Sequence, residues 1–196
     1  MLRVAGLSTP LIGPISLDLD RGECVCVQGA SGSGKSLFLR ALADLDPNDG
    51  AVSLDGRARE AFSAPEWRQA VALVPAESGW WEDHVGAHFA GLPDPTPGLV
   101  ALGLDAALGW EVARLSTGER QRLAILRALQ TGPRLLLLDE PTAALDARSA
   151  LEVEALLCER TQAGLAVLLV THDPAQAARL ATRQYRMDAG KLEAVG

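Results

Sequence analysis

The fold is decided by the stretch Gly29-Ala30-Ser31-Gly32-Ser33-Gly34-Lys35-Ser36, which fits the pattern G-x-x-x-x-G-K-[ST]. An alternating apolar run at 23–28 precedes it and predicts a strand, and residues 37–42 predict the start of a helix. In that setting the glycines let several backbone N–H groups turn toward one anion, and the helix N-terminus adds partial positive charge. We therefore predict that the eight residues bind nucleotide phosphates, with Lys35 at the β- and γ-phosphates and Ser36 as a ligand of Mg²⁺. A glycine-rich turn without a ligand is the alternative, and the flanking strand and helix disfavour it.

Composition places the chain among globular proteins and argues against a nucleic-acid partner. Of its 196 residues, 48% are hydrophobic and 22% are charged, and the formal net charge is −7. An acidic balance disfavours broad contact with a phosphate backbone, so no nucleic acid is expected. Cys24 and Cys26 alternate on one strand face and predict burial, and with Cys158 they form no disulfide framework. No apolar run is long enough to span a bilayer, so we expect a cytoplasmic protein.

The remaining pattern alternates strands with helices. Fully apolar runs at 135–139 and 166–170 are typical of a parallel sheet covered on both faces. Residues 15–19, 51–54 and 71–74 also predict strands, and 185–190 predict a last strand and turn. The stretch after residue 76 is expected to be helical, 92–98 to be a loop, and helices are expected at 120–130, 146–160 and 174–181.

Two acids follow one of the buried strands. Asp139 and Glu140 are expected at the carboxyl end of that strand, where ligands bind in open α/β sheets. An acid there can hold Mg²⁺ through water, and a second can orient or deprotonate an attacking water. His172 also ends a strand and could contact the γ-phosphate. The alternatives are that the acids cap the next helix and that the histidine is structural.

Further motifs make the chain similar to ATP-binding cassette (ABC) ATPases over essentially its whole length. Residues 29–36 resemble the Walker A motif of that family, and 135–139 resemble Walker B, with Glu140 as the catalytic acid. Leu115-Ser116-Thr117-Gly118-Glu119 resembles the L-S-G-G-Q signature that lies between them. Ala144-Leu145-Asp146 matches the D-loop of the family, and His172 matches its switch histidine.

The resemblance implies one α/β domain over residues 1–196 with a P-loop NTPase fold. Its mostly parallel sheet would be covered by helices, with a small antiparallel β part and a short helical subdomain at about 76–115. It implies a head-to-tail homodimer or heterodimer that holds ATP and Mg²⁺ between the subunits. Lys35, Glu140 and His172 would act in hydrolysis, and Ser36 and Asp139 would hold the metal. ATP would be bound in trans by Ser116, Thr117, Gly118, Glu119 and Asp146.

The function implied is ATP hydrolysis that powers a separate transmembrane permease subunit. The chain would then lie peripherally on the cytoplasmic face of the cell membrane. A soluble ABC-type ATPase acting on nucleic acid or ribosomes is the alternative from another class, and an unrelated P-loop kinase is a third.

Several positions depart from the family pattern. Ala76 stands where the family has a metal-sensing glutamine, and Glu77 beside it is a possible replacement ligand. Thr117 and Glu119 replace a glycine and a glutamine of the signature, which predicts weaker ATP-driven closure. No aromatic residue lies in 1–34 to stack on adenine, so we expect loose base selectivity.

Four further side chains invite two interpretations each. Trp80 and Trp81 could belong to the core or to a docking surface, and the sequence does not decide between them. His84 and His88 would share one face of a helix, but without a third ligand a metal site is disfavoured.

Replacement of Lys35 tests the phosphate-loop interpretation. We expect Lys35→Ala to abolish tight ATP binding, because the phosphate charge loses its nearest cation. The measurement is the dissociation constant of a fluorescent ATP analogue, and an unchanged value would contradict the assignment.

Overall fold

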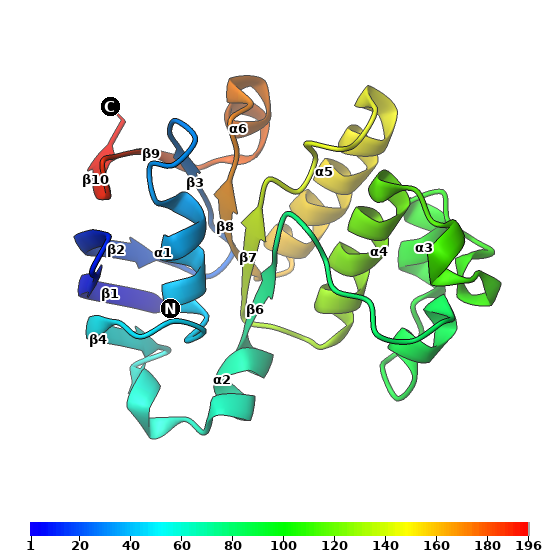
Figure 1. The fold of residues 1–196 in the computed structure, drawn as a ribbon, viewed down its shortest axis with the longest axis horizontal. Coiled ribbons are helices and arrows are strands. Elements are labelled where there is room, and N and C mark those ends of the chain that lie inside the picture. Colours follow the sequence, from blue (N-terminus) through cyan, green and yellow to red (C-terminus); the bar gives the residue numbers. More distant parts are fainter. Residues whose placement is uncertain (196) are drawn as a thin grey trace.

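A six-stranded sheet forms the centre of the molecule in the computed structural model, which describes residues 1–195 (Figure 1). The strand order is β10-β9-β3-β8-β7-β6, and only the β9–β10 pair is antiparallel among these described strands. The bounds are β3 Cys24–Gln28, β6 Val71–Val74, β7 Leu135–Asp139, β8 Ala166–Val170, β9 Arg183–Asp188 and β10 Lys191–Ala194. The predicted α/β architecture with a mostly parallel sheet is therefore confirmed.

Alternate residues of the central strands enter two different hydrophobic cores. Val25 and Val27 of β3 pack in one core, whereas Cys24 and Cys26 pack in the other. Burial raises the pKa of both thiols to about 12, so they stay protonated at neutral pH. The prediction that the two cysteines share a buried face is confirmed.

A smaller antiparallel sheet has the order β2-β1-β4-β5. Its bounds are β1 Leu2–Thr9, β2 Ile12–Leu19, β4 Asp49–Leu54 and β5 Arg57–Ala58. The strand predicted at 15–19 is too short, because β2 already begins at Ile12 and contains Pro14. Proline is tolerated there because β2 lies at the edge of its sheet, where a missing N–H breaks no central ladder.

Helices cover both faces of the central sheet (Figure 1). Helix α1 lies between the two sheets, and α4 and α5 lie on the opposite side of the central sheet. The α-helices are α1 Lys35–Leu42, α2 Ala64–Ala70, α3 Thr96–Ala101, α4 Thr117–Gln130, α5 Ala147–Gln162 and α6 Pro174–Leu180. The 3₁₀ helices are η1 Arg59–Ala61, η2 Val85–Phe89, η3 Ala107–Gly109 and η4 Val112–Arg114. None of the described helices combines the length and the apolar character that a membrane crossing needs.

The structure corrects three predictions about local structure. The loop predicted at 92–98 ends early, because α3 begins at Thr96; Pro97 fits its first turn, where no N–H partner is required. The stretch after residue 76 holds no α-helix before α3, only η2. At the C-terminus, β10 was not predicted, because its four residues carry a single large apolar side chain and so little alternation.

The histidine pair does not form the predicted helical face. Because η2 is a 3₁₀ helix that begins after His84, His84 is exposed and only His88 is buried. Within residues 1–195, no group of three or more His, Cys, Asp or Glu side chains could hold a metal ion.

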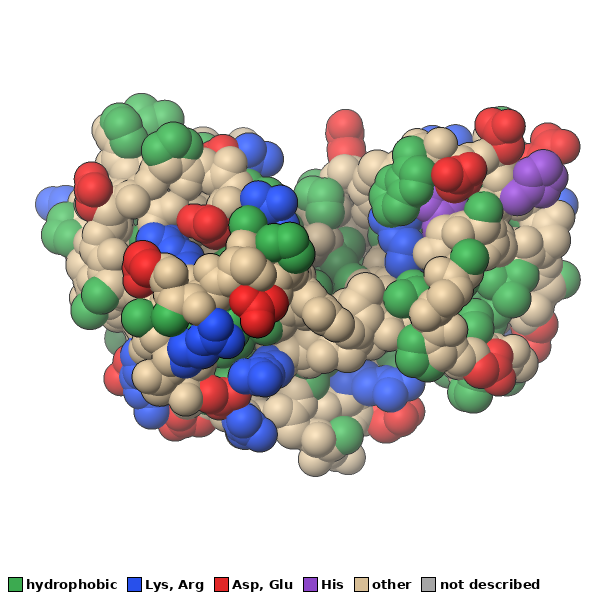
Figure 2. Space-filling view, turned by 90° about the horizontal axis from the view of Figure 1, so that it is seen from below, with side chains coloured by type: hydrophobic (Ala, Val, Ile, Leu, Met, Phe, Trp, Pro, Cys, Tyr) green, Lys and Arg blue, Asp and Glu red, His purple; other side chains and the backbone are tan. Residues whose placement is uncertain are grey.

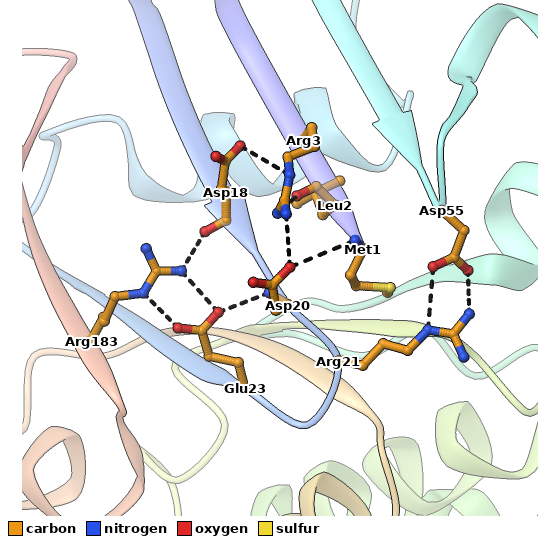
Figure 3. Close-up of polar contacts among 9 residues, drawn as sticks. All are labelled: Met1, Leu2, Arg3, Asp18, Asp20, Arg21, Glu23, Asp55 and Arg183. Atoms are coloured by element: carbon orange, nitrogen blue, oxygen red, sulfur yellow. Dashed lines mark hydrogen bonds and ion pairs between the residues drawn. The ribbon is translucent and has the colours of Figure 1, made fainter.

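Charged side chains join the two sheets at the end where the chain begins (Figure 3). Arg183 of β9 donates to the Glu23 carboxylate at 2.5 and 2.8 Å and to the main-chain oxygen of Asp18 in β2 at 2.6 Å. Asp55, in the turn between β4 and β5, accepts from Arg21 at 2.8 Å and from Arg134 at 3.3 Å. These contacts fix the antiparallel sheet against the central one and keep α1 enclosed between them.

Substitution of Trp67 tests how α2 is attached to this core. Trp67 is 1% exposed, and its Nε1 donates to the carbonyl oxygen of Leu42 at the end of α1 at 2.9 Å. We expect Trp67→Phe to lower the free energy of unfolding by about 1–3 kcal/mol, because a buried acceptor loses its donor.

Urea denaturation followed by circular dichroism measures that loss. Trp81→Phe is the matched control, because Trp81 is 71% exposed, and it should change stability by less than about 0.5 kcal/mol. Equal effects of the two substitutions would contradict the role of the Leu42 bond.

Candidate phosphate-binding site

The candidate site lies at the carboxyl ends of three neighbouring parallel strands. β8 pairs with β3 on one side and with β7 on the other. The loop 29–34 leaves β3, Asp139 ends β7, and His172 follows β8. Ligands bind at this edge of open parallel sheets, because the strand ends and the following helix N-termini converge there.

The phosphate loop has no room for a side chain at Gly34. Gly34 has φ 107°, and a Cβ there would lie 2.5 Å from Cγ2 of Ile12. Within residues 1–195, the Ser33 Oγ is buried and has no hydrogen-bond partner. A tight glycine loop at a helix N-terminus with an unused buried hydroxyl fits an oxyanion ligand.

Lys35 is the first residue of α1 and folds back over the loop. Its Nζ donates to the carbonyl oxygens of Gly29 at 2.8 Å and Ala30 at 3.0 Å. The ammonium group is therefore held at the mouth of the loop by weak neutral acceptors. A phosphate brought to the loop would offer charged acceptors, which make stronger hydrogen bonds.

Glu140 and His172 contact each other across the strand ends. The Nδ1 of His172 lies 2.8 Å from Oε2 of Glu140, and the backbone N–H of His172 donates to the same oxygen at 3.3 Å. Glu140 has φ 49°, a left-handed conformation that is costly for a residue with a side chain. Its N–H donates to the carbonyl of Val170 at 2.9 Å, and this bond holds the strained residue in place.

These groups line one pocket of about 410 Å³. Its walls carry the side chains of Lys35, Ser36, Asp139, Glu140 and His172. The Ser36 hydroxyl and the Asp139 carboxylate are hard oxygen donors of the kind that Mg²⁺ prefers beside phosphates, so this donor set fits the metal.

The signature residues form a capping box at the start of α4. The backbone N–H of Glu119 donates to Ser116 Oγ at 3.2 Å, and the backbone N–H of Ser116 donates to Oε2 of Glu119 at 2.8 Å. The bond from the Ser116 backbone holds the pKa of Glu119 below its usual value. The Glu119 carboxylate therefore points at the N-terminus of its own helix, which compensates part of its negative charge.

The D-loop lies against this signature. A Cβ on Gly118 would lie 3.2 Å from the carbonyl oxygen of Ala144 and 3.1 Å from Cδ2 of Leu145. Asp146 caps α5 by accepting from the backbone N–H of Ser149 at 3.0 Å, and the hydrogen bonds from Ser149 lower the pKa of the Asp146 carboxyl.

The predicted site residues thus fall into two separate groups. The phosphate loop, Asp139, Glu140 and His172 share one pocket, whereas residues 116–119 and Asp146 do not line it. Within one chain, the signature and the D-loop form a second surface of their own.

The β1–β2 loop stands beside the phosphate loop. The Gly190 N–H donates to the carbonyl of Ser33 at 3.0 Å, and the Gly190 carbonyl accepts from the N–H of Gly13 at 2.8 Å. Through this turn, the β1–β2 loop, in which Leu11 is 73% exposed, is tied to the phosphate loop. An aliphatic side chain, not an aromatic ring, is therefore the apolar group presented here.

One polar residue near the site was missed by the sequence analysis. Gln121 is 4% exposed; its Oε1 accepts from Ser78 Oγ at 3.1 Å, and its Nε2 donates to the Pro75 carbonyl at 3.4 Å. It thereby joins α4 to the segment after β6 that contains Ala76. The available signal was a polar residue on the apolar face of a predicted helix, three and four positions before Ala124 and Ile125.

Comparison with known proteins finds the same family throughout. The profile of the family described as "ABC transporter" matches residues 12–143. The chain is 42% identical over 189 residues to the aliphatic sulfonates import ATP-binding protein SsuB 2 of Paracoccus denitrificans, covering 93% of this chain and 73% of that protein.

It is also 35% identical to the macrolide export ATP-binding/permease protein MacB of Marinobacter nauticus; 95% of this chain matches, but only 32% of that longer protein. Among solved structures, an ATP binding subunit of an ABC transporter superposes with TM-score 0.91 at 26% identity, covering 100% of this chain and 89% of that one.

Two glycines of the phosphate loop allow a matched test. Gly34→Ala should weaken binding of a fluorescent ATP analogue by about 100-fold or more, because the loop must move to relieve the contact with Ile12. Gly32→Ala should weaken it by about tenfold or less, since at φ 78° it meets no atom within 4 Å and carries only backbone strain. Equal losses of affinity in the two variants would contradict the role assigned to Gly34.

Proposed function

The chain belongs to the ABC transporter family, and from this we propose that it is the ATP-hydrolysing subunit of a transporter whose membrane-spanning permease is a separate chain. The observation that carries the proposal is the pocket that joins the phosphate loop to Asp139, Glu140 and His172. The relatives support it, because SsuB 2 is named an import ATP-binding protein and MacB an export ATP-binding/permease protein.

ATP binding uses the loop and the helix behind it. The N–H groups at the start of α1 bind the phosphate oxygens, and Lys35 exchanges its two carbonyl acceptors for the β- and γ-phosphates. Ser36 and Asp139 would hold Mg²⁺, which neutralises phosphate charge when bound. Adenine would rest beside Leu11, without ring stacking, so this site should discriminate weakly between purine bases.

Hydrolysis uses the Glu140–His172 pair. The Glu140 carboxylate accepts a proton from the water that attacks the γ-phosphorus, and its strained backbone keeps it pointed at the pocket. With both ring nitrogens protonated, His172 would donate through Nδ1 to that carboxylate, which lies 2.8 Å away, and through Nε2 to a γ-phosphate oxygen.

A head-to-tail dimer would complete each site. Within one chain the signature and the D-loop lie outside the phosphate pocket, so a second copy or a related chain must supply them. The N-terminus of α4, with Ser116 and Gly118, would then face the γ-phosphate of the partner. This arrangement explains why both motifs lie together on a surface of their own.

A groove between β6 and α2 on one side and residues 78–92 on the other supplies a docking place for the permease, and we call it the interlobe groove. This interlobe groove has a volume of about 520 Å³, and β6 and the C-terminal half of α4 line it. Figure 2 shows it as a hollow with hydrophobic side chains in its depth. Leu45, which is 44% exposed, and Trp81, which is 71% exposed, stand on its walls. Exposed apolar side chains around one hollow are typical of a protein-binding surface.

Glu140→Gln tests the hydrolysis step. We expect kcat for phosphate release to fall about 100-fold or more, with ATP binding kept and an ATP-bound dimer accumulating on size-exclusion chromatography. Glu193→Gln, an exposed carboxylate on β10, is the control and should leave turnover unchanged. Normal hydrolysis by Glu140→Gln would show that another residue acts as the general base.

The same variant tests the transporter assignment. Tagged Glu140→Gln, solubilised from native membranes in mild detergent with Mg-ATP, should carry a stoichiometric multi-span protein identifiable by mass spectrometry. Recovery only with ribosomes, nucleic acid or soluble proteins would refute transport and leave the ATP chemistry intact.

A further inference from the structure

The charged side chains that line the interlobe groove are all positive. Arg68 of α2 and Arg127 of α4 both line it, and among the described residues that line it there is no Asp or Glu. Within residues 1–195, neither arginine lies within ion-pair distance of a carboxylate, although the whole chain carries a net charge of −7. An apolar hollow with unpaired cations favours an occupant that brings its own negative charge.

Arg127 is the more constrained of the two arginines. Its guanidinium carbon lies 4.6 Å from the ring centre of Trp80 and 4.7 Å from that of Trp81. Nη2 donates to the carbonyl of Gly79 at 3.0 Å, and Nη1 donates to Nδ1 of His88 at 3.2 Å. All of these partners are neutral, so the positive charge is held in a fixed orientation without a counterion.

Burial makes this lack of a counterion costly. Desolvation lowers the pKa of Arg127, yet a guanidinium remains protonated at any physiological pH. Aromatic faces and neutral acceptors recover only part of the lost hydration of a charge. A carboxylate placed against the open side of the guanidinium would recover more, through short charge-assisted hydrogen bonds.

We propose that Arg127 is the anchor of the interlobe groove, and that the permease segment docked there presents an Asp or Glu carboxylate to it while its apolar side chains cover Leu45 and Trp81. This inference rests on the proposed function, because it specifies the chemistry of the permease segment. Both Trp80 and Trp81 thereby receive a role, since their rings hold the guanidinium in position, and Trp81 also lines the groove.

The position of Arg127 gives the anchor a route to the ATP site. α4 begins at Thr117, next to the Ser116 cap, and Arg127 lies about 15 Å along the same helix at 1.5 Å per residue. A displacement of Arg127 by the docked segment would therefore move the signature as well, because both belong to the same helix. Gln121 joins this helix to Pro75 and Ser78, on either side of Ala76 and Glu77. α4 can thus connect the groove to the signature even though Ala76 has no polar side chain.

Zero-length cross-linking tests the carboxylate directly. A carbodiimide activates a carboxylate, a neighbouring lysine amine displaces the activated group, and an amide forms while the reagent leaves as its urea. Background is low, because Lys35 and Lys191 are the lysines of the chain. Arg127→Lys would be placed in the tagged Glu140→Gln protein, purified from native membranes with Mg-ATP, cross-linked and digested for mass spectrometry.

Arg134→Lys in the same background is the control. Arg134 lies 3.3 Å from Asp55, so this variant should give a cross-link within the chain and show that the reagent works. The expected result for Arg127→Lys is an amide to an Asp or Glu in a cytoplasmic segment of the co-purified multi-span protein. That amide should be absent from the control.

A second variant measures the strength of the anchor. Arg127→Gln keeps a donor toward His88 and removes the charge, and it should lower recovery of the multi-span protein by about tenfold or more. Arg127→Lys should restore most of the recovery. Thermal unfolding of both variants, compared with the parent, shows whether the groove itself remains folded.

Two outcomes would overturn the inference, and they are distinguishable. If the multi-span protein is recovered and the Asp55 control cross-link forms, but the amine of Arg127→Lys joins nothing, or only acids of this chain or a second copy, the anchor is wrong and the transporter assignment stands. If no multi-span protein is recovered with the parent, the proposed function fails, and the anchor fails with it.

Discussion

The ladder of main-chain hydrogen bonds that joins β3, β8 and β7 is the constraint on which the phosphate pocket depends. These strands are parallel and in register, so the loop after β3, His172 after β8 and Asp139 at the end of β7 meet at one edge. Glu140 belongs to the same ladder through its bond to the Val170 carbonyl. Because each strand is buried on both faces, none can slip by one residue without moving its apolar side chains into the wrong core.

Helix α4 relates this rigid edge to the rest of the molecule. Its N-terminus carries the signature and packs against the D-loop, its buried face contributes to the second core, and Gln121 and Arg127 reach the segment after β6. The helix therefore joins the signature, the D-loop, the second core and the segment after β6. Its capping box uses the Glu119 carboxylate internally, so the negative charge of this residue is compensated by the N-terminus of its own helix.

Much of the fold could be predicted from the sequence, because the decisive signals are local. The glycine pattern at 29–36 and the fully apolar runs at 135–139 and 166–170 each specify one element and its environment. The errors occurred where tertiary context overrides a local signal. Pro14 lies in a strand because that strand is an edge, Pro97 lies in the first turn of α3, and β10 gains its stability from pairing with β9.

The residues of the candidate site were predicted one by one, and the family resemblance, not any local pattern, placed residues 116–119 and Asp146 in trans. In the structure these residues do not line the pocket that contains Lys35. The sequence does not show that Arg127 and His88, far apart along the chain, meet between two tryptophans. Such contacts depend on how the loops after β6 return to α4, and no local pattern encodes that path.

The separation of the signature from the phosphate pocket also determines when the chemistry can occur. If each complete site needs two copies, an isolated chain holds ATP beside an incomplete set of charge-stabilising groups and consumes little of it. The rate of hydrolysis then depends on the square of the local concentration of the chain. A membrane protein that holds two copies side by side would raise their effective concentration, and ATP hydrolysis would be confined to assembled complexes.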